Sequence, residues 1–98
     1  MADLSGRTAF VTGGGRGIGA AIAKAVAEAG GDVAINYRRD EEAANETAEA
    51  VRALGRRSEA YGADLADFDA CEAMAQQALS DFGGFDILVN NGGLASRG

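Results

Sequence analysis

The chain has 98 residues, of which 47% are hydrophobic and 24% charged, with no histidine and a formal net charge of −6. One small globular domain fits this length and composition, and the acidic balance argues against a general nucleic-acid-binding protein. No apolar run reaches the roughly 20 residues that cross a bilayer, the N-terminus lacks a signal-peptide pattern, and one cysteine excludes an internal disulfide. We therefore expect a cytoplasmic protein without a nucleic-acid or membrane partner.

Strands and helices are predicted to alternate along the chain. The continuous apolar run at 8–12 is typical of a strand covered on both faces, and further strands are expected at 32–36, 57–63 and 85–90. Helices are expected at about 17–29, 41–54 and 68–82, because Asp40 and Asp67 suit N-caps and glycines follow each helix. The inner stripe of the first helix is expected to contain Ile18, Ala21, Ile22, Ala25, Val26 and Ala29.

The inner faces of the other two helices follow from the same spacing. The second helix is expected to bury Ala44, Ala48, Val51 and Leu54, and the third Cys71, Met74, Ala75, Ala78, Leu79 and Phe82. Cys71 is therefore interpreted as a buried structural thiol. The glutamates of the second helix are interpreted as a solvated face, and we predict no metal site.

The order β-α-β-α-β-α-β with short connections predicts a parallel sheet with right-handed crossovers. We assign the fold class α/β, a partial Rossmann-type doubly wound sheet with strand order 3-2-1-4. The last strand would then be an edge, although residues 87–89 are continuously apolar and carry no lysine, proline or bulge that protects an edge. We therefore expect residues 1–98 to be the N-terminal half of one Rossmann domain whose remainder is absent. Cover by dimerisation or by another chain is the alternative.

A glycine-rich turn, residues 12–19 (TGGGRGIG), joins the first strand to the first helix. A helix N-terminus attracts phosphate, and glycines let a pyrophosphate approach the backbone closely, so this order predicts a dinucleotide-binding turn. The residues after the turn lack the lysine and hydroxyl of a P-loop, which excludes that alternative. A turn that only packs a helix tightly against a strand stays open. The candidate cofactor-binding residues here are Gly13, Gly15, Arg16, Gly17, Ile18 and Gly19.

Three motifs follow the strands in order: Thr12-Gly13-x-x-x-Gly17-x-Gly19, Asp64 after the third strand, and Asp86-Ile87-Leu88-Val89 followed by Asn90-Asn91-Gly92-Gly93. Together they resemble the short-chain dehydrogenase/reductase family. The resemblance covers essentially the whole chain and is nearest in look to 3-oxoacyl-acyl-carrier-protein reductases. It implies an oxidoreductase that transfers hydride between a nicotinamide cofactor and a carbonyl or alcohol, with a 3-oxoacyl thioester as one candidate substrate. It also implies a parent protein that is a homo-oligomer.

The resemblance places further cofactor contacts on this chain. Asp64 would receive the adenine amino group, the Leu65 backbone would contact an adenine ring nitrogen, and Asn90 would lie beside the adenine ribose. Asn91 would tie the fourth strand to its neighbours through side-chain hydrogen bonds. Gly92 stands where the family usually has alanine, which keeps the backbone approach open.

The end of the second strand distinguishes the two nicotinamide cofactors. A carboxylate there would bind the ribose 2′-hydroxyl of NAD, but Tyr37 and Arg38 stand at this point. A guanidinium pairs with phosphate in a fork, and Arg16 could reach the same phosphate. We predict NADP(H) in preference to NAD(H). The alternative is that Arg38 and Arg39 are solvated turn residues.

No catalytic residue is assigned within the chain. The family uses a tyrosine with a lysine four residues later, but Tyr37 is followed there by Glu41, and Tyr61 by Leu65. We therefore expect the catalytic positions to lie beyond Gly98, and this chain alone to be inactive. A nucleotide-binding module without turnover is the alternative function.

Overall fold

Four short segments form one parallel sheet in the computed structural model, which describes residues 3–91. In chain order the elements are β1 (Thr8–Thr12), α1 (Gly17–Glu28), β2 (Asp32–Tyr37), α2 (Glu41–Ala53), β3 (Ser58–Gly62), α3 (Phe68–Phe82) and β4 (Ile87–Asn90). The strand order is β3-β2-β1-β4, and all three pairs are parallel. The predicted α/β class and strand order are confirmed.

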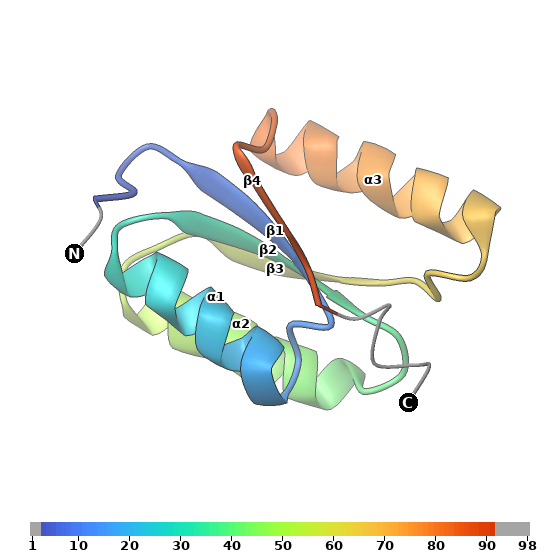
Figure 1. Ribbon diagram of the computed structural model, residues 1–98, viewed down its shortest axis with the longest axis horizontal. Helices are drawn as coiled ribbons and strands as arrows, with labels where there is room; N and C mark the ends of the chain where they lie inside the picture. The colour runs from blue at the N-terminus through green and yellow to red at the C-terminus, as the bar shows by residue number, and fades with distance from the viewer. Residues whose placement is uncertain (1–2, 92–98) are drawn as a thin grey trace.

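Helices cover both faces of the sheet. Figure 1 shows α1 and α2 on one face and α3 on the other. Alternate residues of each strand point to opposite faces, so Ala9 and Val11 pack with α1 and α2, whereas Phe10 packs with α3. Because both faces are covered, the central strands are apolar without alternation.

Aspartate caps start two of the helices, as predicted. The Asp40 carboxylate accepts a hydrogen bond from the Ala43 amide at 3.0 Å at the start of α2. Asp67 accepts one from the Ala70 amide at 3.1 Å at the start of α3. These bonds satisfy N–H groups that have no partner inside the helix.

The predicted inner stripe of α1 is wrong in part, although Val26 is buried and Ile22 packs against the core as expected. The buried residues are Gly19, Ala23, Val26 and Ala27. Ala21 and Ala25 are exposed, and Ile18 is 71% exposed. The reason is the contact of Gly19 with the end of β1, described below, which turns the small-residue face of α1 toward the sheet.

The buried faces of α2 and α3 differ less from the prediction than that of α1 does. In α2 the residue Thr47 is buried, whereas Leu54, which follows the last turn, is 47% exposed. In α3 only Met74 and Ala78 are buried, and Cys71 is half-buried. Leu79 is 48% exposed. Helical spacing identified the correct side of α2 and α3, and in α3 it overestimated the width of the buried stripe.

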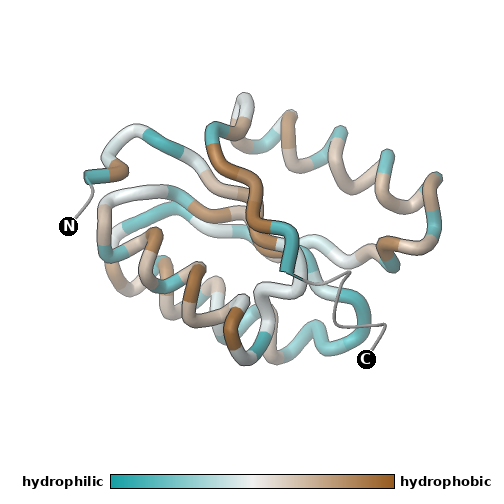
Figure 2. Tube along the Cα trace, viewed as in Figure 1, coloured by the Kyte–Doolittle hydropathy of each residue, from teal (hydrophilic) through white to brown (hydrophobic). Residues whose placement is uncertain are grey.

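β4 forms one edge of the sheet and is shorter than the predicted 85–90. Before β4 begins, the Asp86 amide already donates to the Thr8 carbonyl at 2.8 Å, and the Phe85 ring packs 5.1 Å from that of Phe10. Figure 2 shows β4 as a largely hydrophobic strand, and Leu88 is 72% exposed. The unprotected apolar edge expected from the sequence is present.

A hydroxyl–carboxylate bond joins α3 to the opposite edge strand, β3. The Tyr61 hydroxyl donates to Asp81 Oδ2 at 2.6 Å, and the Gln77 side-chain amide donates to the other oxygen, Oδ1, at 3.1 Å. Burial, followed by this hydrogen bond and the Asp81 charge, raises the pKa of the Tyr61 hydroxyl well above its usual value. The protonated phenol is therefore the form that the folded chain favours.

We expect Tyr61→Phe to lower the free energy of unfolding at pH 7 by about 0.5–1.5 kcal/mol, because the bond to Asp81 is lost. Because the pKa of Tyr61 is raised in the folded chain, Tyr61 contributes its full stability below the unfolded-state pKa of about 10. That contribution is lost as the pH rises further. The difference between wild type and variant should therefore shrink above pH 10. Urea unfolding at pH 7 and pH 10.5 measures it, and a difference that stays constant with pH would contradict the assignment.

Candidate cofactor-binding site

The first half of the glycine turn is held by hydrogen bonds from two neighbouring strands. The Gly13 amide donates to Asn36 Oδ1 at 3.3 Å, and the Gly14 amide donates to the Asn36 carbonyl at 3.1 Å. On the other side, Asn91 Nδ2 donates to the Gly13 carbonyl at 3.2 Å, as expected for a residue that ties β4 to its neighbours. The turn is therefore fixed between β2 and the end of β4.

The second half of the turn lies against α2. The Thr47 hydroxyl lies 3.2 Å from both the Gly15 carbonyl and the carbonyl of Ala43 in its own helix. A Cβ on Gly15 would lie 3.2 Å from the Ala44 amide nitrogen. The backbone at Gly15 is thus packed closely on α2.

Gly19 permits the closest approach of α1 to the turn. A Cβ on Gly19 would overlap the Gly13 carbonyl oxygen and would lie 2.8 Å from Asn91 Nδ2. Gly17, the first residue of α1, has φ +57°, a conformation that side chains disfavour. The two glycines together allow the chain to leave β1 and enter α1 within a short distance.

The N-terminus of α1 differs from those of α2 and α3 because no side chain caps it. Its N-cap is Arg16, which makes no side-chain capping bond, and the first turn contains no acidic residue. Unpaired N–H groups and the helix dipole make such an end attractive to an anion. The exposed Ile18 lies in this first turn.

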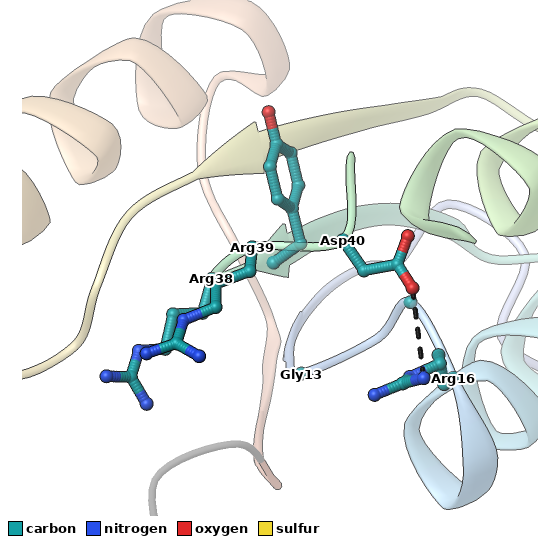
Figure 3. A pocket seen from close by; sticks show the side chains of 7 residues that line it. Gly13, Arg16, Arg38, Arg39 and Asp40 are labelled. Carbon is teal, nitrogen blue, oxygen red and sulfur yellow. Dashed lines mark ion pairs between the residues drawn. The ribbon is translucent and has the colours of Figure 1, made fainter. Parts of the chain in front are cut away.

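A pocket of about 250 Å³ opens between the glycine turn and the loop after β2. It is lined by Gly13, Gly15, Arg16, Tyr37, Arg38, Arg39 and Asp40. Figure 3 shows Arg16 projecting from the start of α1, while Arg38 and Arg39 extend from the loop. The structure thus places Arg16 and Arg38, which are distant in sequence, on one pocket.

The charges around this pocket are predominantly positive. Arg16 pairs with Asp40 at 3.8 Å and Arg38 with Asp64 at 3.5 Å, and all four side chains are at least 46% exposed. Within the described residues, Arg39 has no carboxylate within 4.0 Å. Exposed pairs of this kind contribute about 0–1 kcal/mol, so the guanidinium groups stay available to a stronger anionic partner.

The residues expected around adenine follow β3. One oxygen of Asp64 accepts from the Ala66 amide at 2.9 Å, and the other lies beside Arg38. The Leu65 side chain packs against the core cluster under α3. Tyr37 is half-buried, and its ring lies against the backbone of Gly62.

The residues expected at the end of β4 and directly after it lie near the base of the turn. The exposed Asn90 has its side-chain oxygen 3.4 Å from the Thr12 hydroxyl, and the Asn91 amide donates to that hydroxyl at 2.9 Å. Asn91 is therefore linked to both Thr12 and Gly13. The predicted contact at Gly92 lies outside the described residues.

Four residues of the site were not assigned to it from the sequence: Asn36, Thr47, Arg39 and Asp40. Asn36 and Thr47 carried a signal, because each is a polar residue at a position that its strand or helix pattern buries. Arg39 and Asp40 carried none, since charged residues in a loop are most often solvated. Asp40 was predicted only as a helix cap, and it also pairs with Arg16.

Neither a metal site nor a membrane-spanning helix is found in the described part of the chain. No group of three or more histidine, cysteine, aspartate or glutamate side chains among residues 3–91 is placed to hold a metal ion. The Cys71 thiol lies 3.5 Å from the Asp64 carbonyl. Within the same residues, no helix has the length and apolar character needed to cross a membrane.

Comparison with known proteins gives a consistent family. The short chain dehydrogenase family model matches residues 7–98. The chain is 47% identical over 91 residues to a hydroxynaphthalene reductase of Aspergillus fumigatus, which covers 93% of this chain and 33% of that protein. It is 42% identical over 92 residues to a 3β-hydroxysteroid dehydrogenase of Eggerthella lenta, covering 94% and 35%.

A solved structure agrees with the fold. A short chain dehydrogenase from Burkholderia cenocepacia, crystallised in complex with NADP, is 50% identical and superposes with a TM-score of 0.88. The match covers 93% of this chain and 37% of that one. The chain thus spans about a third of the length of these relatives.

We expect Gly19→Ala to destabilise the chain by about 1–3 kcal/mol, because the added methyl group cannot fit against the Gly13 carbonyl. Thermal unfolding measures the effect. Gly15→Ala is the matched control in the same turn, and it should cost less, since its methyl group meets Ala44 at 3.2 Å and needs only a small shift. Equal losses from the two substitutions would show that this contact does not control the turn.

Proposed function

Because the chain belongs to the short-chain dehydrogenase/reductase family, we propose that residues 1–98 are the N-terminal cofactor-binding half of a single Rossmann domain in an NADP(H)-dependent oxidoreductase. The parent enzyme would transfer hydride between the nicotinamide and a carbonyl or alcohol of a small molecule. The observation that carries the proposal is the arginine-lined pocket beside the uncapped N-terminus of α1.

The proposed binding mode divides the cofactor between backbone and side chains. The diphosphate would lie at the start of α1, where the turn from Gly13 to Gly19 presents N–H groups and little side-chain bulk. The adenine would lie toward Asp64 and Leu65, with its ribose near Asn90. The nicotinamide supplies the hydride when the cofactor is bound. The residues of this chain would bind and orient the diphosphate and the adenosine part of the cofactor.

The preference for NADP(H) is argued from the charges of the pocket. Three arginines line it against one aspartate, in a chain whose net charge is −6. A 2′-phosphate could replace Asp40 and Asp64 as the partners of Arg16 and Arg38. Breaking these ion pairs would cost little free energy, because exposed ion pairs contribute little to stability. The Burkholderia relative crystallised with NADP is consistent with this choice.

Several finer predictions stay open. The relatives reported above are named for different substrates, so the proposal stops at a carbonyl or alcohol, and the 3-oxoacyl thioester stays a prediction. We also keep as predictions the cytoplasmic location and the homo-oligomeric parent. The exposed apolar edge of β4 would be covered by further strands of the same domain.

We expect Arg38→Ala to weaken NADPH binding about tenfold or more, the effect of one charge-assisted contact of about 1.5–3 kcal/mol. NADH binding should be unchanged, because NADH lacks the 2′-phosphate. Calorimetric titration of the complete gene product with both cofactors measures this. Lys24→Ala, which removes an exposed charge from α1, is the control and should leave both affinities unchanged. Equal losses for NADPH and NADH would contradict the cofactor preference.

We expect the 98-residue chain alone to show no NADPH-dependent reduction of ketones, because neither Tyr37 nor Tyr61 is followed four residues later by a lysine. The complete gene product should reduce carbonyl compounds if it carries such a pair. The alternative, a nucleotide-binding module without turnover, predicts that both proteins bind cofactor and neither is active. Absorbance at 340 nm follows the reaction, and turnover by the 98-residue chain would contradict the proposal.

A further inference from the structure

Asn36 is a buried amide in a strand that is otherwise mostly apolar. It is 2% exposed, near the end of β2, and the residues before it, Val33, Ala34 and Ile35, are fully buried. A polar group in this position costs free energy unless its hydrogen bonds are made inside the protein. The partners of Asn36 therefore indicate why an amide stands there.

The two ends of this amide bind different parts of the fold. Its oxygen accepts the bond from the Gly13 amide at 3.3 Å. Its nitrogen lies 3.2 Å from the carbonyls of Tyr37 and Ala63 and 3.5 Å from that of Tyr61. The same nitrogen lies 3.3 Å from the Met74 sulfur.

An amide side chain matches this arrangement. The glycine turn presents an N–H donor to it, and the end of β3 presents carbonyl acceptors, so the side chain must accept on one side and donate on the other. An ionised aspartate would accept on both sides, a leucine of similar size would do neither, and a hydroxyl would offer a single oxygen for both tasks. The chemistry of the partners thus favours an amide and determines its orientation.

We infer that Asn36 is a positioning residue. It holds the glycine turn, where the diphosphate is proposed to lie, at a fixed distance from residues 63–65, which are called the adenosine wall because adenine is proposed to lie beside them. The inference rests on the proposed function, which places the diphosphate at the turn and adenine beside Asp64. Ala63 immediately precedes Asp64, so one buried side chain connects the two halves of the proposed site.

The two halves do not depend on Asn36 equally. Both halves keep a backbone bond without this side chain: the Ala63 amide donates to the Tyr37 carbonyl at 3.0 Å, and the Gly14 amide donates to the Asn36 carbonyl at 3.1 Å. The halves differ in the bonds that the side chain itself makes. On the turn side Asn36 Oδ1 accepts the single N–H of Gly13, whereas on the β3 side its nitrogen is shared among carbonyls at 3.2–3.5 Å. Loss of the side chain should therefore loosen the turn more than the adenosine wall. A ligand that spans both halves should lose more affinity than one that contacts adenosine alone.

The test compares two ligands on the complete gene product: NADPH, which spans both halves, and adenosine 2′-phosphate, which lacks the diphosphate. In Asn36→Leu we expect NADPH to bind about tenfold more weakly, the effect of one lost hydrogen bond of about 1.4 kcal/mol. Adenosine 2′-phosphate should bind with less than about a threefold change, since the backbone bond at Ala63 is kept. Calorimetric titration measures both affinities.

The matched control is Ser58→Ala, which removes another buried polar group from an adjacent strand. Ser58 is 1% exposed, and its hydroxyl has no hydrogen-bond partner within the described residues, so this substitution should leave both affinities unchanged. Asn36→Thr is the second variant, because its hydroxyl can still accept and donate, although it lies one bond nearer the backbone. We expect it to lose less NADPH affinity than the leucine variant, and it serves as the test if the leucine variant fails to fold.

The outcomes separate the inference from its premise. Equal loss of both ligands in the Asn36 variants would show a general loosening of the fold, and unchanged NADPH binding would show that the turn does not need this bond. Either result overturns the positioning role while the wild-type protein still binds NADPH. A wild-type protein that binds neither ligand would overturn the proposed function and this inference with it.

Discussion

The close approach of α1 to the end of β1 is the contact on which the rest of the structure depends. Gly19 lies against the carbonyl of Gly13, at a distance that leaves no room for a side chain. This contact turns the small residues of α1 toward the sheet and leaves Ile18 exposed at the start of the helix. It also places the unpaired N–H groups of α1 directly beyond the carboxyl ends of the strands, where ligands of parallel sheets bind.

A second constraint is that a turn made largely of glycine has few side chains of its own to hold it. The structure supplies them from neighbouring elements: Asn36 from β2, Thr47 from α2, and Asn91 after β4. Each bonds a backbone group of the turn. The turn can therefore be both unobstructed toward a ligand and fixed in position, which glycine alone would not allow because of its conformational freedom.

The sequence predicted the fold well because the relevant signals are local. Aspartate caps, glycine stops and continuous apolar runs located every element within a few residues, and the alternation of strand and helix implied the parallel order. The buried face of α1 was mispredicted because Ile18 is more hydrophobic than Gly19 or Ala23. Packing against the turn depends on small size rather than on hydrophobicity. The supporting roles of Asn36 and Thr47 could not be derived, since they depend on partners that lie far away in the sequence.

In the proposed binding mode, the division between backbone and side chains would separate the binding of a dinucleotide from the choice between NADP(H) and NAD(H). The turn and the start of α1 act through backbone groups, and the side chains that hold them point into the protein. The arginines act at the outer rim of the pocket and contribute little to the fold, because their ion pairs are exposed. Substitutions in the loop after β2 can therefore change the charge of the pocket without disturbing the turn. In the proposed enzyme, cofactor specificity would be adjustable at Arg38 and Arg39, while Gly13, Gly19 and Asn36 would tolerate little change.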